Sequence, residues 1–273
     1  MQKKLIALDL DGTLLYDWST LKEETKDYLI DLQAQGHTVV IATGRPFRSS
    51  DHFYDALQLK TPLINFNGGI ITSKHDPHFP DQHIWLDKDA VLDIFRENRA
   101  LITNAFCEIK DNVYLLKDDK ALYPFLHLNE YSTLTVGPFE KTLPGPTNGF
   151  IALAEKGNGD KIEAYIEAHY QDIILSRNWG NDETDVIEIF TPKTNKGEAL
   201  AGVASYLGFA QADTIAFGDG HNDIEMLKWA GIGVAMANAH PAAKAAADIV
   251  SEKTNQEFAI EYHLDQLIKK GDY

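Results

Sequence analysis

Cysteine and positive charge are both scarce in this sequence. Cys107 is the only cysteine among 273 residues, which excludes an intrachain disulfide and any metal site that needs two thiolates. The 25 Lys and Arg residues face 41 Asp and Glu residues, which gives a net charge of −16. Nucleic acids and anionic membranes repel such a chain, so we expect neither as a partner.

Long hydrophobic runs are missing as well. The apolar run near the N-terminus is interrupted by Asp9 and Asp11 and has no small-residue cleavage site, unlike a secretory signal. No stretch approaches the ~20 apolar residues that span a bilayer, and the single thiol fits a reducing compartment, so we expect a cytoplasmic protein. The composition, 44% hydrophobic and 24% charged, is that of a packed globular chain. At ~150 residues per domain, the length suggests two domains.

Short apolar runs alternate with helical patterns at both ends of the chain. Such runs are typical of strands buried on both faces, and their alternation with helices predicts an α/β fold with a doubly wound parallel sheet. The expected strands lie at residues 5–10, 37–42, 63–66, 214–217, 232–236 and 249–250.

Two local patterns add detail. Thr20 and Glu23 match a capping box, which predicts the start of a helix that ends at Gly36. Asn67-Gly68-Gly69 is typical of a hairpin turn into residues 70–72, although it also follows an expected strand of the core.

The middle of the chain has a different rhythm. A helical stretch at residues 87–99 precedes alternating segments at 103–108 and 113–117, which Asp111-Asn112 joins as a predicted hairpin. We therefore predict a core of residues 1–81 and 191–273, and an inserted α+β domain of residues 82–190.

Polar residues gather where the expected core strands end. Ligands of open α/β sheets bind outside the carboxyl ends of the strands. Four carboxylates are among these residues, and two like charges ~4 Å apart repel by roughly 4 kcal/mol at an effective dielectric of 20. Convergence would therefore require a cation or raised pKa values, and ligands that are all oxygen favour Mg²⁺. The residues are Asp9, Asp11, Thr43, Asn67, Asp219, Asn222 and Asp223.

Lys196 stands in the first turn of an expected helix, where the helix dipole disfavours a cation. A phosphate or the carboxylates themselves would compensate this charge, although a solvated lysine is an equally good interpretation of the residue alone. A lysine, Mg²⁺, a threonine hydroxyl and backbone N–H groups around one phosphoryl group suit phosphoryl transfer.

Four segments, in this order, resemble the motifs of the haloacid dehalogenase (HAD) phosphohydrolase superfamily. They are residues 9–14 (Asp-Leu-Asp-Gly-Thr-Leu), 42–45 (Ala-Thr-Gly-Arg), 196–197 (Lys-Gly) and 218–223 (Gly-Asp-Gly-His-Asn-Asp). The insertion between the second and third motifs, together with the tail at residues 233–239, is similar to the Cof-like sugar phosphatase group with its type IIB cap. The resemblance spans nearly the whole chain.

The resemblance implies a Mg²⁺-dependent phosphohydrolase of a small phosphorylated metabolite, with a sugar phosphate as the expected substrate. Asp9 would be the nucleophile that forms an aspartyl-phosphate, Asp11 the general acid and base, and Lys196 the cation that neutralises the phosphoryl group. The implied substrate-binding residues are Thr43, Gly44 and Asn222. The implied metal ligands are Asp9, Asp11 through its main-chain carbonyl, Asp219 and Asp223.

Two other functions fit parts of the pattern. A phosphomutase, such as the related phosphomannomutases, returns the phosphoryl group to a sugar in place of water. A phospho-acceptor signalling module also combines acidic residues, a lysine, a threonine and Mg²⁺, but such modules have ~120 residues and lack an insertion of this length. Arg45 fits an ion pair as well as a substrate contact, and the oligomeric state is not indicated.

Overall fold

The computed structural model describes residues 2–269, and the chain forms two compact units. The first unit comprises Met1–Arg45, Ser50–Gln82 and Asn195–Tyr273, and the second comprises Pro46–Ser49 and His83–Thr194. The insertion expected at residues 82–190 overlaps the long segment of the second unit. The short segment that joins it, Pro46–Ser49, had no signal in the sequence.

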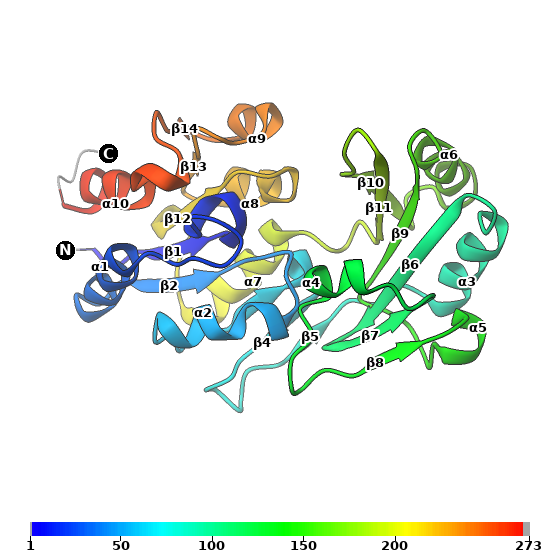
Figure 1. The fold of residues 1–273 in the computed structure, drawn as a ribbon. Helices are drawn as coiled ribbons and strands as arrows, with labels where there is room; N and C mark the ends of the chain where they lie inside the picture. Colours follow the sequence, from blue (N-terminus) through cyan, green and yellow to red (C-terminus); the bar gives the residue numbers. More distant parts are fainter. Residues whose placement is uncertain (1, 270–273) are drawn as a thin grey trace. The chain divides into compact units, whose positions relative to one another are not determined.

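The first unit is built on a parallel sheet of five strands in the order β14-β13-β12-β1-β2 (Figure 1). Its strands are the short apolar runs of the sequence, and the side chains of β1, which lies between β12 and β2, are fully buried. The predicted doubly wound α/β fold is confirmed. The strands are β1 (Leu5–Leu8), β2 (Thr38–Ile41), β12 (Thr214–Gly218), β13 (Ile232–Ala235) and β14 (Ile249–Val250).

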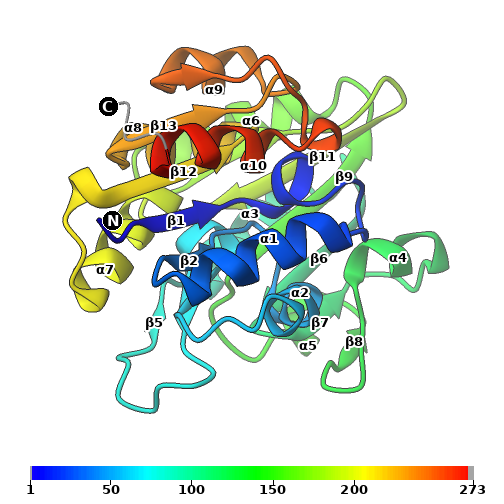
Figure 2. The ribbon, with the colours of Figure 1, turned by 90° about the vertical axis from the view of Figure 1, so that its left-hand side faces the viewer.

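Helices pack around this sheet (Figure 2). The longest two, α1 and α7, have 12 residues each, and α7 ends at Gly208, whose φ of +78° closes the last turn. In the part of the chain that the structure describes, no helix has the length and apolar character to cross a membrane. The helices are α1 (Glu23–Ala34), α2 (Asp51–Ala56), α7 (Lys196–Leu207), α8 (Ile224–Trp229), α9 (Pro241–Ala246) and α10 (Ala259–Leu264).

The register of the sheet aligns the carboxyl ends of three strands. Leu8, the last residue of β1, pairs with Phe217 of β12 on one side and with Ile41 of β2 on the other. The residues that follow Leu8, Phe217 and Ile41 therefore emerge at the same edge of the sheet.

A hairpin extends the unit beyond β2. Strands β3 (Leu63–Asn65) and β4 (Ile70–Thr72) are antiparallel, which confirms the predicted turn at residues 67–69. Ala42 forms a parallel bridge with Ile64, so β3 continues the direction of the main sheet. Strand β5 (Gln82–His83) lies where the chain passes from one unit to the next.

The start of the chain differs from the sequence prediction in two places. Strand β1 ends at Leu8 because Leu10–Leu14 form a π-helical turn, which contains Gly12 at φ +70°. The capping box is wrong: helix α1 begins at Glu23, and its N-cap residue makes no side-chain hydrogen bond to the helix. The Thr20 hydroxyl donates instead to the Asp17 carboxylate over 3.0 Å.

The second unit is a six-stranded sheet in the order β10-β11-β9-β6-β7-β8. Every pair is antiparallel except β7 and β8, and the predicted β6–β7 hairpin is confirmed. The strands are β6 (Ile102–Ile109), β7 (Asn112–Leu115), β8 (Leu134–Val136), β9 (Gly149–Glu155), β10 (Leu175–Asn178) and β11 (Thr184–Phe190). The helices are α3 (Lys88–Glu97), α4 (Tyr123–Leu126), α5 (Phe139–Thr142) and α6 (Gly159–Tyr170).

Arg48 explains why Pro46–Ser49 clusters with this second unit. Its buried guanidinium forms an ion pair with Glu108, and its Nε donates to the Leu126 carbonyl over 2.9 Å. Its backbone N–H donates to the Asp111 carboxylate over 2.8 Å. Burial raises the pKa of Glu108, and the charge of Arg48 opposes that shift.

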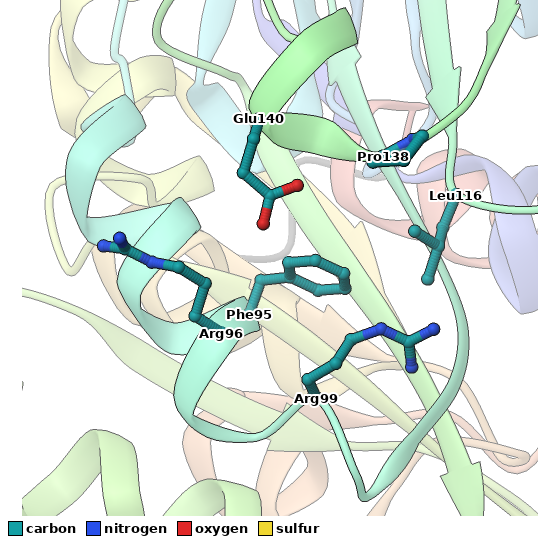
Figure 3. A pocket seen from close by; sticks show the side chains of 6 residues that line it. All are labelled: Phe95, Arg96, Arg99, Leu116, Pro138 and Glu140. Carbon is teal, nitrogen blue, oxygen red and sulfur yellow. The ribbon is translucent and has the colours of Figure 1, made fainter.

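A pocket opens on the second unit between α3 and α5 (Figure 3). The Arg99 guanidinium lies 5.6 Å from the centre of the Phe95 ring. The lining includes one carboxylate, that of Glu140, so the pocket has no set of ligands for a divalent ion. The lining residues are Phe95, Arg96, Arg99, Leu116, Pro138 and Glu140.

We predict that Phe139→Ala destabilises the second unit by about 3–5 kcal/mol, because it removes a fully buried ring. Its centroid lies 5.0 Å from that of Phe95 and 5.9 Å from that of Phe150. The measurement is the free energy of unfolding from urea titration. Phe125→Ala is the control, because this residue is 61% exposed and the loss of its ring should cost less than about 0.5 kcal/mol. Equal losses in the two variants would contradict this packing.

Candidate active site

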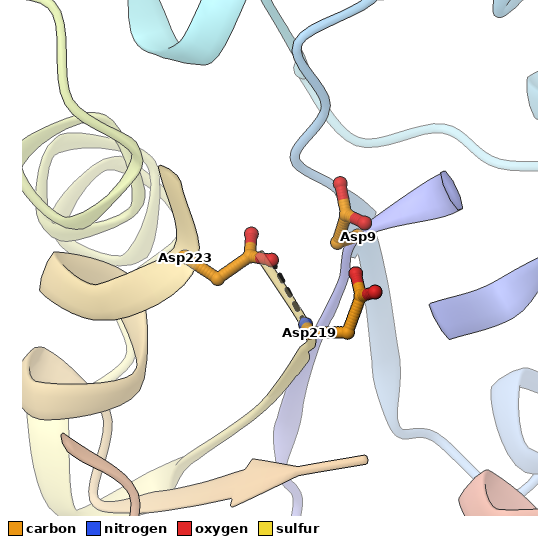
Figure 4. Close-up of side chains that lie close together, drawn as sticks. All are labelled: Asp9, Asp219 and Asp223. Carbon is orange, nitrogen blue, oxygen red and sulfur yellow. Dashed lines mark hydrogen bonds between the residues drawn. The ribbon is translucent and has the colours of Figure 1, made fainter. Parts of the chain in front are cut away.

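Three carboxylates meet at the carboxyl edge of the parallel sheet (Figure 4). Asp9 follows β1 and Asp219 follows β12, so the strand register brings them together, and Asp223 closes the short 3₁₀ turn after Asp219. Each offers one carboxylate oxygen, and the three oxygens lie within 4.8 Å of one another. The prediction that acidic residues converge at this edge is therefore correct for these three side chains.

Lys196 lies against this acidic group. Its Nζ is 2.5 Å from Asp9 Oδ1 and 2.6 Å from Asp223 Oδ1, and its side chain is 0% exposed. Lys196 opens helix α7, where Asn195 caps the helix by accepting a hydrogen bond from the Glu198 N–H. Burial acts to lower the pKa of Lys196, but the two carboxylates outweigh burial and raise it, so the amine stays charged. The lysine is buried and paired, and not a solvated side chain.

One lysine does not balance three carboxylates. Burial, followed by the charge of Asp223, raises the pKa of Asp9 well above its usual value. The same two causes, in the same order, raise the pKa of Asp219 to about 7. Lys196 lowers both pKa values but does not cancel the repulsion. The excess negative charge and the all-oxygen donor set fit a hard divalent cation such as Mg²⁺.

Asp223 has a second task in addition to its contact with Lys196. Its Oδ2 accepts hydrogen bonds from the backbone N–H groups of Asp219, over 2.9 Å, and Gly220, over 2.8 Å. Both of its oxygens are therefore engaged by protein donors. These bonds fix the loop that presents the Asp219 side chain.

Asp11 lies apart from this group. Arg45 binds its carboxylate with two hydrogen bonds, 2.8 Å from Nε to Oδ2 and 2.5 Å from Nη2 to Oδ1. Nη2 also donates to the Trp18 carbonyl over 2.6 Å. The sequence left Arg45 open between an ion pair and a substrate contact, and the structure shows the ion pair. Gly12, next to Asp11, passes so close to the Asp219 carboxylate that a Cβ there would collide with it.

The expected substrate-binding residues lie around the turn after β3. Thr43 is buried, and its Oγ1 accepts a hydrogen bond from the Arg45 N–H over 3.1 Å. A Cβ on Gly44 would lie 3.0 Å from Asn67 Oδ1, and the same oxygen accepts a hydrogen bond from Asn222 Nδ2 over 2.8 Å. The Asn67 N–H also donates to the Thr43 carbonyl, so Asn67, which the sequence indicated mainly as part of a hairpin turn, contacts all three expected residues.

Asn238 is a site residue for which the sequence analysis predicted no role. Its Nδ2 donates to the Gly12 carbonyl over 2.8 Å and reaches Asp219 Oδ2 at 3.3 Å. Its Oδ1 accepts from the Asn255 N–H over 3.2 Å. Asn238 therefore connects the turn after Asp9 to Asp219. The signal for it was present in the sequence, since Asn238 belongs to the tail at residues 233–239, but one amide in a short loop has no distinctive spacing.

Comparison with known proteins gives a consistent family. Residues 6–264 match the haloacid dehalogenase-like hydrolases. The chain is similar to the 5-amino-6-(5-phospho-D-ribitylamino)uracil phosphatase YitU of Bacillus subtilis, with 35% identity over 254 residues, which are 93% of each chain. It is also similar to the pyridoxal phosphate phosphatase YbhA of Escherichia coli, with 31% identity over 92% of this chain and 93% of the relative. The crystal structure of TM0651 from Thermotoga maritima shares the fold, with a TM-score of 0.81, 23% identity and 97% coverage of both chains.

The raised pKa of Asp219 predicts how the metal-free protein responds to pH. In the unfolded chain an Asp carboxyl has a pKa of about 3.9, so between about pH 4 and pH 7 the folded state holds a proton that the unfolded state has lost. This group's contribution to stability is therefore full below about pH 4 and is lost as the pH rises to about 7. The Asp219→Asn variant has no titratable group at this position, so it does not lose this contribution to stability as the pH rises to about 7.

The measurement is the melting temperature in EDTA between pH 4 and pH 8 for the wild type and for Asp219→Asn. We expect the variant's advantage to be near zero at pH 4 and to increase up to about pH 7. The comparison at pH 4 is the internal control for any packing effect of the amide. An advantage that does not change with pH would contradict the raised pKa.

Proposed function

The chain belongs to the haloacid dehalogenase-like hydrolase family, and from this premise we propose that it is a Mg²⁺-dependent phosphatase of small phosphorylated metabolites. The reaction transfers the phosphoryl group to Asp9 and then to water. The observation that carries the proposal is the buried Lys196 between Asp9 and Asp223, with Asp219 beside them. Phosphoryl transfer requires positive charge that neutralises the phosphoryl oxygens. A fixed lysine beside a carboxylate nucleophile and a divalent-ion site would supply it.

Asp9 is the proposed nucleophile. Its residue is 4% exposed, and Lys196 holds Oδ1, so the carboxylate has one defined orientation. Attack by a carboxylate oxygen forms the bond to phosphorus while the bond from phosphorus to the leaving alcohol oxygen breaks. The resulting aspartyl-phosphate is then hydrolysed by water, which regenerates the Asp9 carboxylate and releases inorganic phosphate.

Asp11 is the proposed general acid and base. An alkoxide is a poor leaving group, so the departing oxygen requires a proton. The Asp11 side chain is 38% exposed, in contrast to buried Asp9, and it lies two residues from the nucleophile. The same carboxyl group, after it has given up its proton, accepts one from the water that attacks the aspartyl-phosphate.

The proposed Mg²⁺ ligands are the carboxylates of Asp9 and Asp219 and the main-chain carbonyl of Asp11, with Asp223 beside them. The donors fit, because they are oxygens in a group with excess negative charge. When bound, the ion neutralises charge on the phosphoryl oxygens. Lys196 adds a second, fixed positive charge from the protein itself.

The proposed substrate is a phosphate ester of a primary alcohol. The names of two relatives give a phosphorylated ribityl chain and pyridoxal phosphate, and in both compounds the phosphate is on a CH₂ oxygen. A sugar phosphate with a terminal phosphate has the same chemistry. Thr43, Gly44 and Asn222 are the proposed contacts to the phosphoryl group.

A phosphomutase remains the second candidate, because the first half of its reaction would use the same residues. The products separate the two: a hydrolase releases inorganic phosphate, and a mutase returns an isomeric sugar phosphate. The signalling module is not supported, because the match to the hydrolases extends over residues 6–264 and includes the insertion.

We predict that Asp9→Asn abolishes the release of p-nitrophenol from p-nitrophenyl phosphate, because an amide is a poor nucleophile. The fold should persist, since the change removes a repelled carboxylate. Asp17→Asn, on the exposed loop before α1, is the control and should keep full activity. Mass spectrometry of Asp11→Asn should detect a phosphorylated protein that Asp9→Asn/Asp11→Asn does not form. Turnover by Asp9→Asn would overturn the assignment of the nucleophile.

We further predict that EDTA stops turnover and that Mg²⁺ restores it. The independent readout is calorimetric titration of Mg²⁺ into the metal-free protein without substrate. Asp219→Asn should weaken binding by at least tenfold, because it removes one charged ligand. Asp213→Asn, at the opposite end of β12, should bind Mg²⁺ as the wild type does. Wild-type affinity in Asp219→Asn would remove Asp219 from the metal site.

A further inference from the structure

The turn between β3 and β4 has an unusual backbone. Phe66, Asn67 and Gly68 are consecutive, and all have positive φ angles, of +49°, +55° and +94°. For residues with a side chain, this left-handed conformation costs of the order of 1–3 kcal/mol and persists only where surrounding contacts enforce it. A hairpin alone does not need three such residues in a row.

The contacts of Asn67 lead to the second motif. The Asn67 N–H donates to the Thr43 carbonyl over 3.0 Å, and the Phe66 N–H donates to the Arg45 carbonyl over 3.2 Å. The carboxamide of Asn67 packs against Gly44, at a position where a Cβ on Gly44 would be 3.0 Å from the amide oxygen. The left-handed turn thus lies along residues 43–45.

The third and fourth motifs contact the same turn. At Gly68, an added Cβ would lie 2.6 Å from the Asn195 carbonyl oxygen and 2.9 Å from Ala199 Cβ, so the turn packs directly on the first turn of α7. That helical turn carries Lys196. From the loop after β12, Asn222 Nδ2 donates to Asn67 Oδ1 over 2.8 Å. One turn of three residues therefore adjoins the second, third and fourth motifs.

We infer that Asn67 is a positioning residue: its carboxamide packs against Gly44 and holds the Asn222 carboxamide, and so sets the binding geometry for the phosphoryl group. The left-handed backbone is what directs the Asn67 side chain toward both residues. The inference rests on the proposed function, because it takes Asn222 as a contact to the phosphoryl oxygens. Asn67 acts through Asn222 and takes no part in the chemical step.

The test compares Asn67→Gly with the wild type. Glycine adopts the left-handed backbone without strain, so this change removes the side chain and keeps the turn. We expect KM for p-nitrophenyl phosphate, and the inhibition constant of inorganic phosphate, to rise about tenfold. We expect kcat to change by less than about twofold, because the lost contact serves the ground state and the transition state alike.

A double-variant cycle tests the connection to Asn222. If Asn67 acts through Asn222, then Asn67→Gly/Asn222→Ala should raise KM no further than Asn222→Ala alone. Gln58→Gly is the matched control, because Gln58 also has a positive φ, of +55°, in the same unit and lies outside the four motifs. It should leave KM unchanged. Losses that multiply in the double variant, or an unchanged KM in Asn67→Gly, would overturn the inference.

A second measurement does not depend on catalysis. The side-chain amide resonances of Asn222 in ¹⁵N-labelled protein should shift in Asn67→Gly and stay in place in Gln58→Gly. A wild-type protein that releases no phosphate would refute the proposed function, and the Asn222 resonances would still decide whether Asn67 holds that side chain. Unshifted Asn222 resonances would refute the positioning role even if the enzyme is active.

Discussion

The structure of the candidate site depends on the ion pairs of Lys196. A fully buried ammonium group touches Asp9 on one side and Asp223 on the other, and removal of the lysine would leave two carboxylates without their cation in a site that excludes water. The loop of Asp219 and the charge balance of the site both depend on these ion pairs. Asp223 also accepts hydrogen bonds from two backbone N–H groups and so fixes the loop of Asp219. The raised pKa values of Asp9 and Asp219 reflect more negative charge in the site than one lysine balances.

The environment gives the two aspartates at the end of β1 different properties. Asp9 is buried beside a lysine, whereas Asp11, two residues later, is partly exposed and held by the guanidinium of Arg45. A nucleophile benefits from a fixed orientation and a dry environment, and an acid that must exchange protons with water benefits from exposure. Asp9 follows β1 directly, whereas Asp11 lies inside the π-helical turn Leu10–Leu14, which begins at the last residue of the expected strand.

The parts of the site that the sequence predicted are those set by strand ends. A parallel sheet places the carboxyl ends of neighbouring strands at one edge, so apolar runs followed by Asp9, Thr43 and Asp219 were sufficient to predict convergence. The contacts that the sequence left open are between side chains far apart in the chain, such as Asn67 with Asn222 and Asn238 with Asp219. The capping box failed because α1 begins only at Glu23, so Thr20 lies before the helix, where its N–H and its hydroxyl both donate to the Asp17 carboxylate. Pro46–Ser49 belongs to the second unit because of one buried arginine, Arg48. A single buried arginine produces no hydrophobic periodicity from which this contact could have been predicted.

Substrate specificity has no pattern in the sequence, because the predicted site residues serve the phosphoryl group and not the rest of the substrate. In the proposed reaction the carboxylates, Lys196 and the turn around Asn67 serve the phosphoryl group, which is the same in every phosphate monoester. The names of the two relatives share the phosphate and differ in the rest of the compound, which is a ribitylaminouracil in one and pyridoxal in the other. Discrimination must therefore come from side chains that contact the leaving group, and such contacts need only shape and a few polar atoms, without a fixed spacing in the chain. The chemical step leaves a pattern in the sequence, and the choice of substrate does not.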